Sequence, residues 1–438
     1  MTDESTNVTL NRMVNTCVVT DKGDSIYWKI EEAEEGAQTA ERGAAHLIHT
    51  ARVISKNDLS KFSAFATDTC PTQLLIHKKV QSNPDTKHML TVLCNSHSLQ
   101  LFIGDLLKLP TINEVWQIAL NIVNGLRNTT KQYKYLQVEQ VKEYGYKKAL
   151  ISTGKTRWGT QVGMLKSLYN SFQALRKFAI NPLVEFEYTN MLLDIEFWGK
   201  ITELLELLHP INEKQKMSED NRATLATVAQ DWAEIQYHLE QKANSTSFYA
   251  GDITDFLGEV GEDRGSAWEQ RVNRQISDIH IVAYFLRPQN YDKPITDYHQ
   301  DRIREVFQQY ITDWLSAYKL FFNFREQRGL FSVTSKVWEM VKDGDLFWTY
   351  SRPKCPELAS FARRLLNTIA NSVPSERAWS TMNYIHSKTR NRLSLERVNK
   401  LCFIYINTRT LRKINDYEPT DEELLDYEDN LIQALEGA

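Results

Sequence analysis

The stretch NSVPSERAWSTMNYIHSKTRNRLSLERVNKLCFIYIN, residues 371–407, combines one acid near its start with many basic residues after it. Glu376 heads a strongly basic run, although the whole chain has a net charge of −4. From Glu376 to Lys413 there are nine basic residues and two acids, whereas the segment from 414 onward has nine acids and no base. A basic run of this kind is either the solvated face of amphipathic helices or a surface for phosphate groups, and both interpretations remain open at this point.

Length and composition indicate a globular protein with more than one packed unit. The chain has 438 residues, and one hydrophobic core rarely serves more than roughly 250–300. A hydrophobic share of 42% and a charged share of 25% match folded domains rather than disordered ones. No apolar run approaches the ~18 residues that a membrane span needs, and the first residues lack a signal-peptide pattern. We therefore expect an intracellular protein with no membrane partner.

The five cysteines indicate reduced thiols. They are scattered and form no CxxC pair, so we expect neither a disulfide framework nor a structural zinc site. Cys94 and His97 are spaced like two metal ligands, but a structural zinc ion needs about four. A buried structural role for this pair, or a contact from His97 to phosphate, is the preferred interpretation.

The first 110 residues alternate between strand and helix patterns. MVNTCVV and DSIYWKI are β-branched and aromatic runs separated by the turn signal DKGD, which predicts a hairpin. A helix is expected over 39–55, a strand over KFSAFATDTC, and a further strand over 89–94. The first of these strands leaves Asp68 at its carboxyl end, where the ligand sites of α/β sheets lie. The pattern predicts a mixed α/β sheet.

The rest of the chain is expected to be helical. From about residue 159 to 350, apolar residues recur at three- and four-residue spacing over long segments. Three more amphipathic helices are expected between 351 and 413, and the last of them carries a broad apolar stripe. The acidic segment 414–438 is expected to form a tail.

Several blocks of the sequence resemble one protein family. The stretch from PELASFARRLLNTIANS through FIYIN closely resembles the C-terminal dimerisation segment of hAT-superfamily (hobo/Activator type) DNA transposases. In the same order, FATDTC resembles that family's second-aspartate strand, LCNSHSLQLFIGDLLKLP its Cys-x-x-His helix entry, and TGKTRWGTQVGML its Thr-Arg-Trp segment. TDESTNV resembles a degenerate form of the first-aspartate motif. The likeness covers about residues 1–412.

This resemblance implies an α/β plus all-α fold, in which an RNase H-like mixed sheet is interrupted by a long all-helical insertion domain. Residues 1–158 would form the N-terminal part of the RNase H-like core and 159–350 the insertion. Residues 351–413 would form the dimerisation region that completes the core, and 414–438 the acidic tail. The first central strand would be largely missing, because only Met1 and Thr2 precede Asp3.

By the same resemblance, Asp3, Asp68 and Glu376 would be the catalytic carboxylates that bind Mg²⁺ or Mn²⁺. Phosphodiester cleavage requires an activated water or hydroxyl and a stabilised leaving oxygen, and two Mg²⁺ ions supply both. The plain alternatives are that Asp68 only forms a turn and that Glu376 only favours a helix N-terminus.

The resemblance also implies two interaction surfaces. The residues expected to contact DNA are His97, Arg157, Trp158, Arg377, Lys388, Arg390 and Arg392. The residues expected to join subunits in a homodimer or higher oligomer are Leu395, Val398, Leu401 and Tyr405. A core position for Trp158, and an ordinary core role for the subunit-joining residues, are the alternatives.

Two functions follow from the resemblance and remain open. The first is a nuclear transposase that cleaves and transfers DNA strands with Mg²⁺. The second is a catalytically inactive, truncated or domesticated remnant that acts through dimerisation and through DNA or protein binding. A helical scaffold unrelated to DNA would explain residues 159–350 but not the order of the other blocks.

Overall fold

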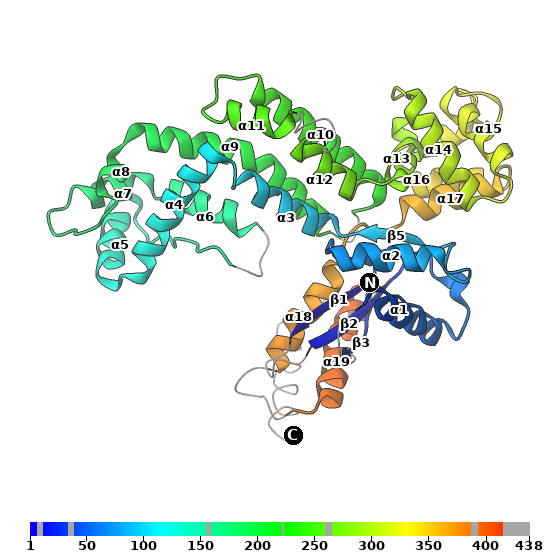
Figure 1. The fold of residues 1–438 in the computed structure, drawn as a ribbon, viewed down its shortest axis with the longest axis horizontal. Helices are drawn as coiled ribbons and strands as arrows, with labels where there is room; N and C mark the ends of the chain where they lie inside the picture. The colour runs from blue at the N-terminus through cyan, green and yellow to red at the C-terminus, as the bar shows by residue number, and fades with distance from the viewer. Residues whose placement is uncertain are drawn as a thin grey trace. The chain divides into compact units, whose positions relative to one another are not determined.

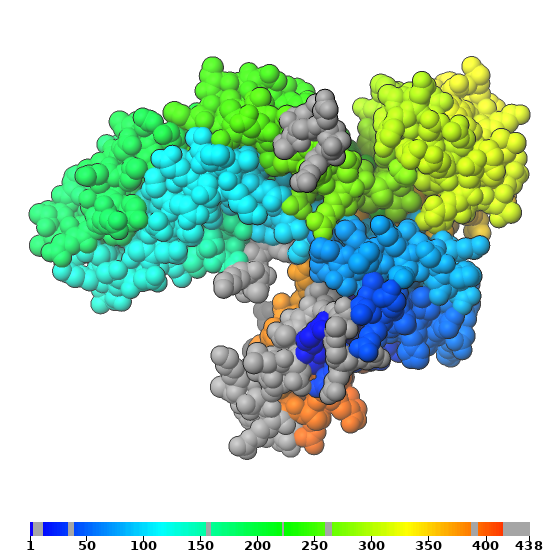
Figure 2. All heavy atoms as spheres, viewed as in Figure 1, coloured from blue at the N-terminus to red at the C-terminus, as the bar shows by residue number. Residues whose placement is uncertain are grey.

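The computed structural model describes residues 1–6, 12–33, 39–154, 159–220, 223–258, 265–386 and 393–414, which form two compact units (Figure 1, with all atoms in Figure 2). One unit joins Met1–Cys94, Asn221–Ala226 and the chain from Asp278 onward. The other joins Asn95–Asp220 and Thr227–Ser277. These units differ from a division at 158 and 350, because the sheet-bearing unit also includes the helices after 278. None of the described helices has the length and apolar character needed to cross a membrane.

An antiparallel sheet opens the first unit. Its strands are β1 (Thr2–Thr6), β2 (Arg12–Val19) and β3 (Ser25–Glu32), with β2 in the middle. The predicted hairpin is confirmed: the Thr20 N–H donates to the Asp24 carbonyl at 3.0 Å, and Gly23 adopts a φ of 84°, which glycine does without strain. The expectation that the first strand is largely missing is wrong. β1 pairs with β2 along its whole length, and its five residues are a common strand length.

A parallel strand pair forms the second sheet. It consists of β4 (Ala64–Thr67) and β5 (Leu90–Leu93), which are connected by α2 (Pro71–Ser82) and preceded by α1 (Ala40–Ser55). Leu47, Phe65, Ile76, Val80 and Met89 belong to the apolar cluster that these elements bury. β1 contacts β4, although the two strands share no ladder. The predicted strands and the helix over 39–55 are thus confirmed.

The same unit contains a group of helices from the later part of the chain. They are α13 (Asp278–Leu286), α14 (Asp297–Tyr310), α15 (Trp314–Arg325), α16 (Gly344–Ser351) and α17 (Pro356–Leu366). Aromatic rings of Phe324, Phe331, Trp338 and Phe347 stack and meet edge to face, with centroids between 5.2 and 6.1 Å apart. On α17, Arg364 donates to the carbonyl of Ser63 beside β4 at 2.9 Å, which fastens this helix to the parallel pair.

The second unit is helical throughout its described residues. Its helices are α3 (Asn95–Leu106), α4 (Pro110–Asn128), α5 (Thr130–Tyr144), α6 (Thr160–Tyr169), α7 (Phe172–Ala179), α8 (Thr189–Leu193), α9 (Ile195–Ser218), α10 (Leu225–Ala243), α11 (Ala250–Leu257) and α12 (Ala267–Gln275). Phe102, Trp232, Phe256 and Trp268 pack together in its core. The Trp232 indole N–H donates to the Asn95 amide oxygen at 2.8 Å, so this large buried ring has a polar partner.

Two C-terminal helices, α18 (Val373–Ile385) and α19 (Leu395–Ile414), complete the first unit against β2 and β3. Their shared apolar cluster includes Met13, Tyr27, Met382, Val398 and Cys402. This docking joins segments that are more than 350 residues apart in the chain, as hydrogen bonds with sequence separations of 360 to 380 show.

Asparagine side chains on α19 close the outer edge of β3. The amide oxygen of Asn407 accepts from the Tyr27 N–H at 2.8 Å, and its NH₂ group donates to the Tyr27 carbonyl at 3.0 Å. Asn399 makes the same pair of bonds with Ile30, at 2.6 and 2.5 Å. Each amide therefore takes the place of a neighbouring strand, and this edge is not left open for pairing with another chain.

Removal of one of these amides should destabilise the first unit. We expect Asn407→Ala to lower the free energy of unfolding by about 2–3 kcal/mol, because it leaves the Tyr27 N–H and carbonyl without partners in a buried place. The matched control is Asn383→Ala on the exposed side of α18, which should change it by less than about 0.5 kcal/mol. Chemical denaturation followed by circular dichroism measures both, and equal effects would contradict this role of Asn407.

Candidate carboxylate site

Asp68 directly follows β4, as the sequence predicts. Its half-buried side chain accepts a hydrogen bond from the Cys70 N–H at 3.1 Å, which shapes the turn into α2. The preceding residue, Thr67, is fully buried, and its hydroxyl lies 2.7 Å from Nε2 of His77 on α2. The strand end that directly precedes Asp68 is therefore held in place by the buried contact between Thr67 and His77.

Glu376 lies in the first turn of α18 and is half-buried. The start of this helix is fixed to the parallel strand pair, because the Ser372 N–H donates to the Cys94 sulfur at 3.2 Å. The Cys94 N–H in turn donates to the Thr67 carbonyl at 2.8 Å. These two bonds connect the helix turn that carries Glu376 to the residue before Asp68. A negative charge is also favourable at a helix N-terminus, so the plain alternative for Glu376 holds alongside any further role.

The backbone of Asp3 belongs to the same neighbourhood. In the β1–β2 ladder Asp3 stands opposite Asn15, and the Asn15 amide donates to the carbonyl of Ser375 at 2.7 Å. Ser375 immediately precedes Glu376. The three predicted positions therefore lie on neighbouring elements of one unit, although the side chain of Asp3 lies outside the described part of the structure.

Several polar side chains are buried between these elements. Asn15 and Ser375 are fully buried, and Ser372 is 1% exposed. Within the described residues the Asn15 amide oxygen and the hydroxyls of Ser372 and Ser375 have no hydrogen-bond partner. Buried polar atoms without partners are rare and costly, so they are expected to bind water or another polar species. Among the side chains that the structure describes, which do not include Asp3, no three His, Cys, Asp or Glu residues form a metal-ligand group.

His77 is neutral at neutral pH. Burial lowers its pKa to about 4, and the negative charge of Asp68 only partly opposes this effect. A neutral imidazole can share a hydrogen bond with the Thr67 hydroxyl but brings no positive charge to the carboxylates. Burial, with a smaller effect of Asp68, also raises the pKa of the Cys70 thiol. Sequence reasoning did not single out His77, although a histidine in the helix that directly follows the Asp68 strand was a signal for it.

Of the residues predicted to contact DNA, the structure describes two, and these belong to different units. Arg377 is exposed on α18 of the first unit, and His97 is half-buried on α3 of the second. Arg157, Trp158, Lys388, Arg390 and Arg392 lie outside the described residues.

The predicted subunit-joining stripe on α19 faces the interior of its own unit. Val398 is 1% exposed in the cluster with β2 and β3, and Leu395, Leu401 and Tyr405 pack partly against that cluster. Val398 thus has the environment of an ordinary core residue.

A second apolar strip lies on the other side of α19, and sequence reasoning did not single it out. Its residues Ile404 and Leu411 are 50% and 58% exposed and lie seven residues apart. That spacing places both on one face and was visible in the sequence.

Comparison with known proteins identifies one region. Residues 334–408 match the hAT family C-terminal dimerisation region. The match covers α16, α17, α18 and most of α19, so it includes the helices that dock on the sheet and carry Glu376. A search of curated proteins found no match.

The pKa of His77 predicts a loss of stability in mild acid. Its folded pKa of about 4 lies below the ordinary 6.5, so the unfolded state binds more protons between these values and unfolding becomes easier as the pH falls. The full effect is about 3 kcal/mol. We expect His77→Gln to flatten this part of the curve of unfolding free energy against pH, whereas His49→Gln, at an exposed position, should not. Urea unfolding across this pH window measures it, and parallel curves for wild type and His77→Gln would contradict the assignment.

Proposed function

This chain carries the C-terminal dimerisation region of the hAT transposase family, and we propose that it is a hAT-type transposase or a protein derived from one, with an RNase H-like core. The proposed ancestral reaction is Mg²⁺-dependent DNA strand cleavage and strand transfer. The observation that carries the proposal is the connection of Asp68, Glu376 and the Asp3 backbone through neighbouring elements of one unit.

The order of the strands supports the RNase H-like core. β3, β2 and β1 form the antiparallel meander, β1 contacts β4, and β5 pairs with β4 in parallel. Side by side in this order, the strands would give one mixed sheet of the proposed type. The carboxyl end of β4 and the start of α18 would then supply two of the acids from opposite ends of the sequence.

The chemistry of the donors fits a hard divalent cation. Asp3, Asp68 and Glu376 would offer carboxylate oxygens, which are the ligands that Mg²⁺ prefers. Bound there, the ion would activate the attacking oxygen and stabilise the leaving one. The chain's own contribution would be to hold the acids in place: Cys94 and Ser372 fix the turn of Glu376, and His77 fixes the strand end before Asp68.

DNA would be the substrate. The proposed contacts are His97, Arg157, Trp158, Arg377, Lys388, Arg390 and Arg392, whose charges and rings suit phosphates and unpaired bases. A nuclear location follows from this substrate. The alternative is an inactive, truncated or domesticated protein that acts through self-association and through DNA or protein binding, and the match to the dimerisation region is compatible with both candidates.

Substitution of Asp68 separates the two functions. For an enzyme we expect nicking or joining of terminal-repeat DNA in the presence of Mg²⁺. Asp68→Asn and Glu376→Gln should each reduce this cleavage activity by more than roughly 10–100-fold, which is the usual loss when a residue that only supports a metal ligand is replaced. Asp58→Asn, at an exposed Asp paired with Lys61, is the matched control. Gel analysis of labelled DNA, with thermal unfolding to check the fold, measures this. No cleavage by the wild type would favour the inactive alternative, and full activity of Asp68→Asn would refute the site.

We propose the outer face of α19 as the surface for self-association. Ile404 lies within the matched dimerisation region, and Leu411 extends the same exposed strip. Val398 is unsuitable as a contact between subunits because it is already buried within one.

Charged substitutions on α19 test this surface. Ile404→Asp should weaken self-association at least about tenfold, or ~1.4 kcal/mol, with little change in unfolding temperature. Val398→Asp should instead unfold the first unit, because it buries a charge. Val333→Asp, at a 72% exposed residue just before the matched region, is the control. Sedimentation velocity with parallel thermal unfolding measures these variants, and unchanged association of Ile404→Asp would exclude the face.

A further inference from the structure

A small basic pocket lies within the first unit, where α18 and α19 meet the turn between β2 and β3. We call it the hairpin pocket. Its volume is about 270 Å³, which is below the ~300–1,000 Å³ of sites that enclose a drug-sized ligand, so it suits a small group rather than a whole cofactor. The residues of its lining that carry the argument are Asp24, Arg377, Thr381, Tyr405, Arg409 and Lys413.

The pocket residues of α19 share one face of that helix. Tyr405, Arg409 and Lys413 follow one another at intervals of four residues, so each lies about 6 Å beyond the last along the helix axis. Arg409 is five positions from Ile404, which corresponds to a rotation of about 140° around the axis. The pocket and the surface proposed for self-association therefore lie on different sides of α19 and can be occupied at the same time.

Defined contacts hold the pocket in shape. The Thr410 hydroxyl donates to the Ser25 carbonyl at 2.7 Å, which fastens α19 to the hairpin. The guanidinium carbon of Arg409 lies 3.9 Å from the centre of the Tyr405 ring. A guanidinium group stacked on a ring keeps the N–H donors at its edge available, because they lie in its plane. Tyr405 thus positions Arg409 without neutralising its charge.

The lining of the hairpin pocket has an excess of positive charge. Arg377, Arg409 and Lys413 are three cations, and Asp24 is the one acid among the described residues that line it, which leaves a net charge of +2. In the described part of the chain, no carboxylate forms an ion pair with Arg409 or Lys413. An anionic ligand would offset this charge.

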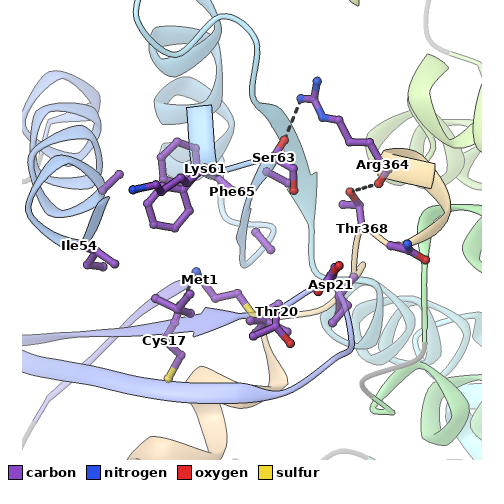
Figure 3. A pocket seen from close by; sticks show the side chains of 18 of the residues that line it. Met1, Cys17, Thr20, Asp21, Ile54, Lys61, Ser63, Phe65, Arg364 and Thr368 are labelled. Carbon is purple, nitrogen blue, oxygen red and sulfur yellow. Dashed lines mark hydrogen bonds between the residues drawn. The ribbon is translucent and has the colours of Figure 1, made fainter. Parts of the chain in front are cut away.

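A larger cavity of the first unit, of about 640 Å³, provides a contrast (Figure 3). Two arginines that line it already have acceptors. Arg363 is paired with Asp345 at 2.8 Å, and the dashed line from Arg364 in Figure 3 marks its bond to the Ser63 carbonyl at 2.9 Å. The smaller hairpin pocket is therefore the better candidate for an anion.

We propose that the hairpin pocket binds phosphate groups of a DNA strand. This inference rests on the proposed function, in which DNA is the substrate, and it adds Arg409 and Lys413 to the DNA contacts. Lys and Arg are the side chains that neutralise phosphates. The separation of about 6 Å between Arg409 and Lys413 along α19 is comparable with that between successive phosphates of one strand. Two such phosphates carry two negative charges, which match the net charge of the lining.

The salt dependence of DNA binding tests this pocket. Fluorescence anisotropy with a short labelled duplex measures binding by the full chain, with EDTA present so that cleavage is not needed. Each phosphate contact contributes about 0.9 to the slope of log affinity against log salt concentration. We expect Lys413→Gln to reduce this slope by about 1 and to weaken binding at least about fivefold at low salt. Thermal unfolding checks the fold of this variant, whose altered side chain is exposed.

Lys400→Gln is the matched control. It removes the same charge from the same helix, but Lys400 pairs with Glu396 at 2.7 Å and does not line the pocket. We expect its slope to equal that of the wild type. Equal reductions in Lys413→Gln and Lys400→Gln would indicate a diffuse charge effect, and an unchanged slope in Lys413→Gln would mean that the pocket makes no phosphate contact. Either result would overturn the proposal.

A second measurement identifies the source of the phosphate. Isothermal titration calorimetry with inorganic phosphate is compared with DNA binding. Phosphate binding that is lost in Lys413→Gln, without DNA binding by the wild type, would assign the pocket to a free anion and overturn the DNA proposal. These results do not depend on catalysis. DNA binding through the pocket without cleavage would refute the enzyme alone, whereas cleavage with an unchanged slope in Lys413→Gln would refute the pocket alone.

Discussion

The first unit depends on the docking of α18 and α19 against the three-stranded sheet. Before this contact, β3 has an open outer edge, and β2 and β3 expose an apolar face that includes Met13 and Tyr27. The helices cover the face with Val398 and Cys402 and close the edge with the amides of Asn399 and Asn407. A side-chain amide can replace a strand because it carries one donor and one acceptor, like a peptide group. The last helix is therefore part of the sheet's hydrogen-bond network.

The same docking builds the candidate site. The turn of α18 that carries Glu376 is held at two points, because the Ser372 N–H donates to Cys94 and the Asn15 amide of β2 donates to the Ser375 carbonyl. These contacts join residues about 280 and 360 positions apart, so they form late in any folding order that begins with local structure. A substitution that loosens α19 is therefore expected to disturb the carboxylates without touching them.

Much of the fold could be predicted from local patterns, and the failures have physical causes. The β2–β3 hairpin, β4, β5 and the long helices follow from periodicity and turn residues within each segment. β1 does not, because TDEST has no apolar alternation and becomes a strand only by pairing with β2. The sequence also left open whether the apolar stripe on α19 packs in its own core or joins subunits, because either role needs the same residue types, and the tertiary contacts of Val398 place it in the core. The acid positions came from family resemblance, and their spatial connection came from the structure.

Electrostatics sets the condition that any function of the site must meet. Three carboxylates brought close together repel one another, and a structure can tolerate this if a cation offsets the charge or if one acid takes up a proton. His77 cannot supply the charge at neutral pH, because its burial keeps the imidazole neutral. The buried Asn15 and Ser375 offer dipoles but no charge. A bound divalent cation would satisfy the condition with the acids ionised, which is the state that metal-assisted phosphodiester cleavage needs. An inactive descendant would have no such requirement, and its acids would be free to relax apart on the same scaffold.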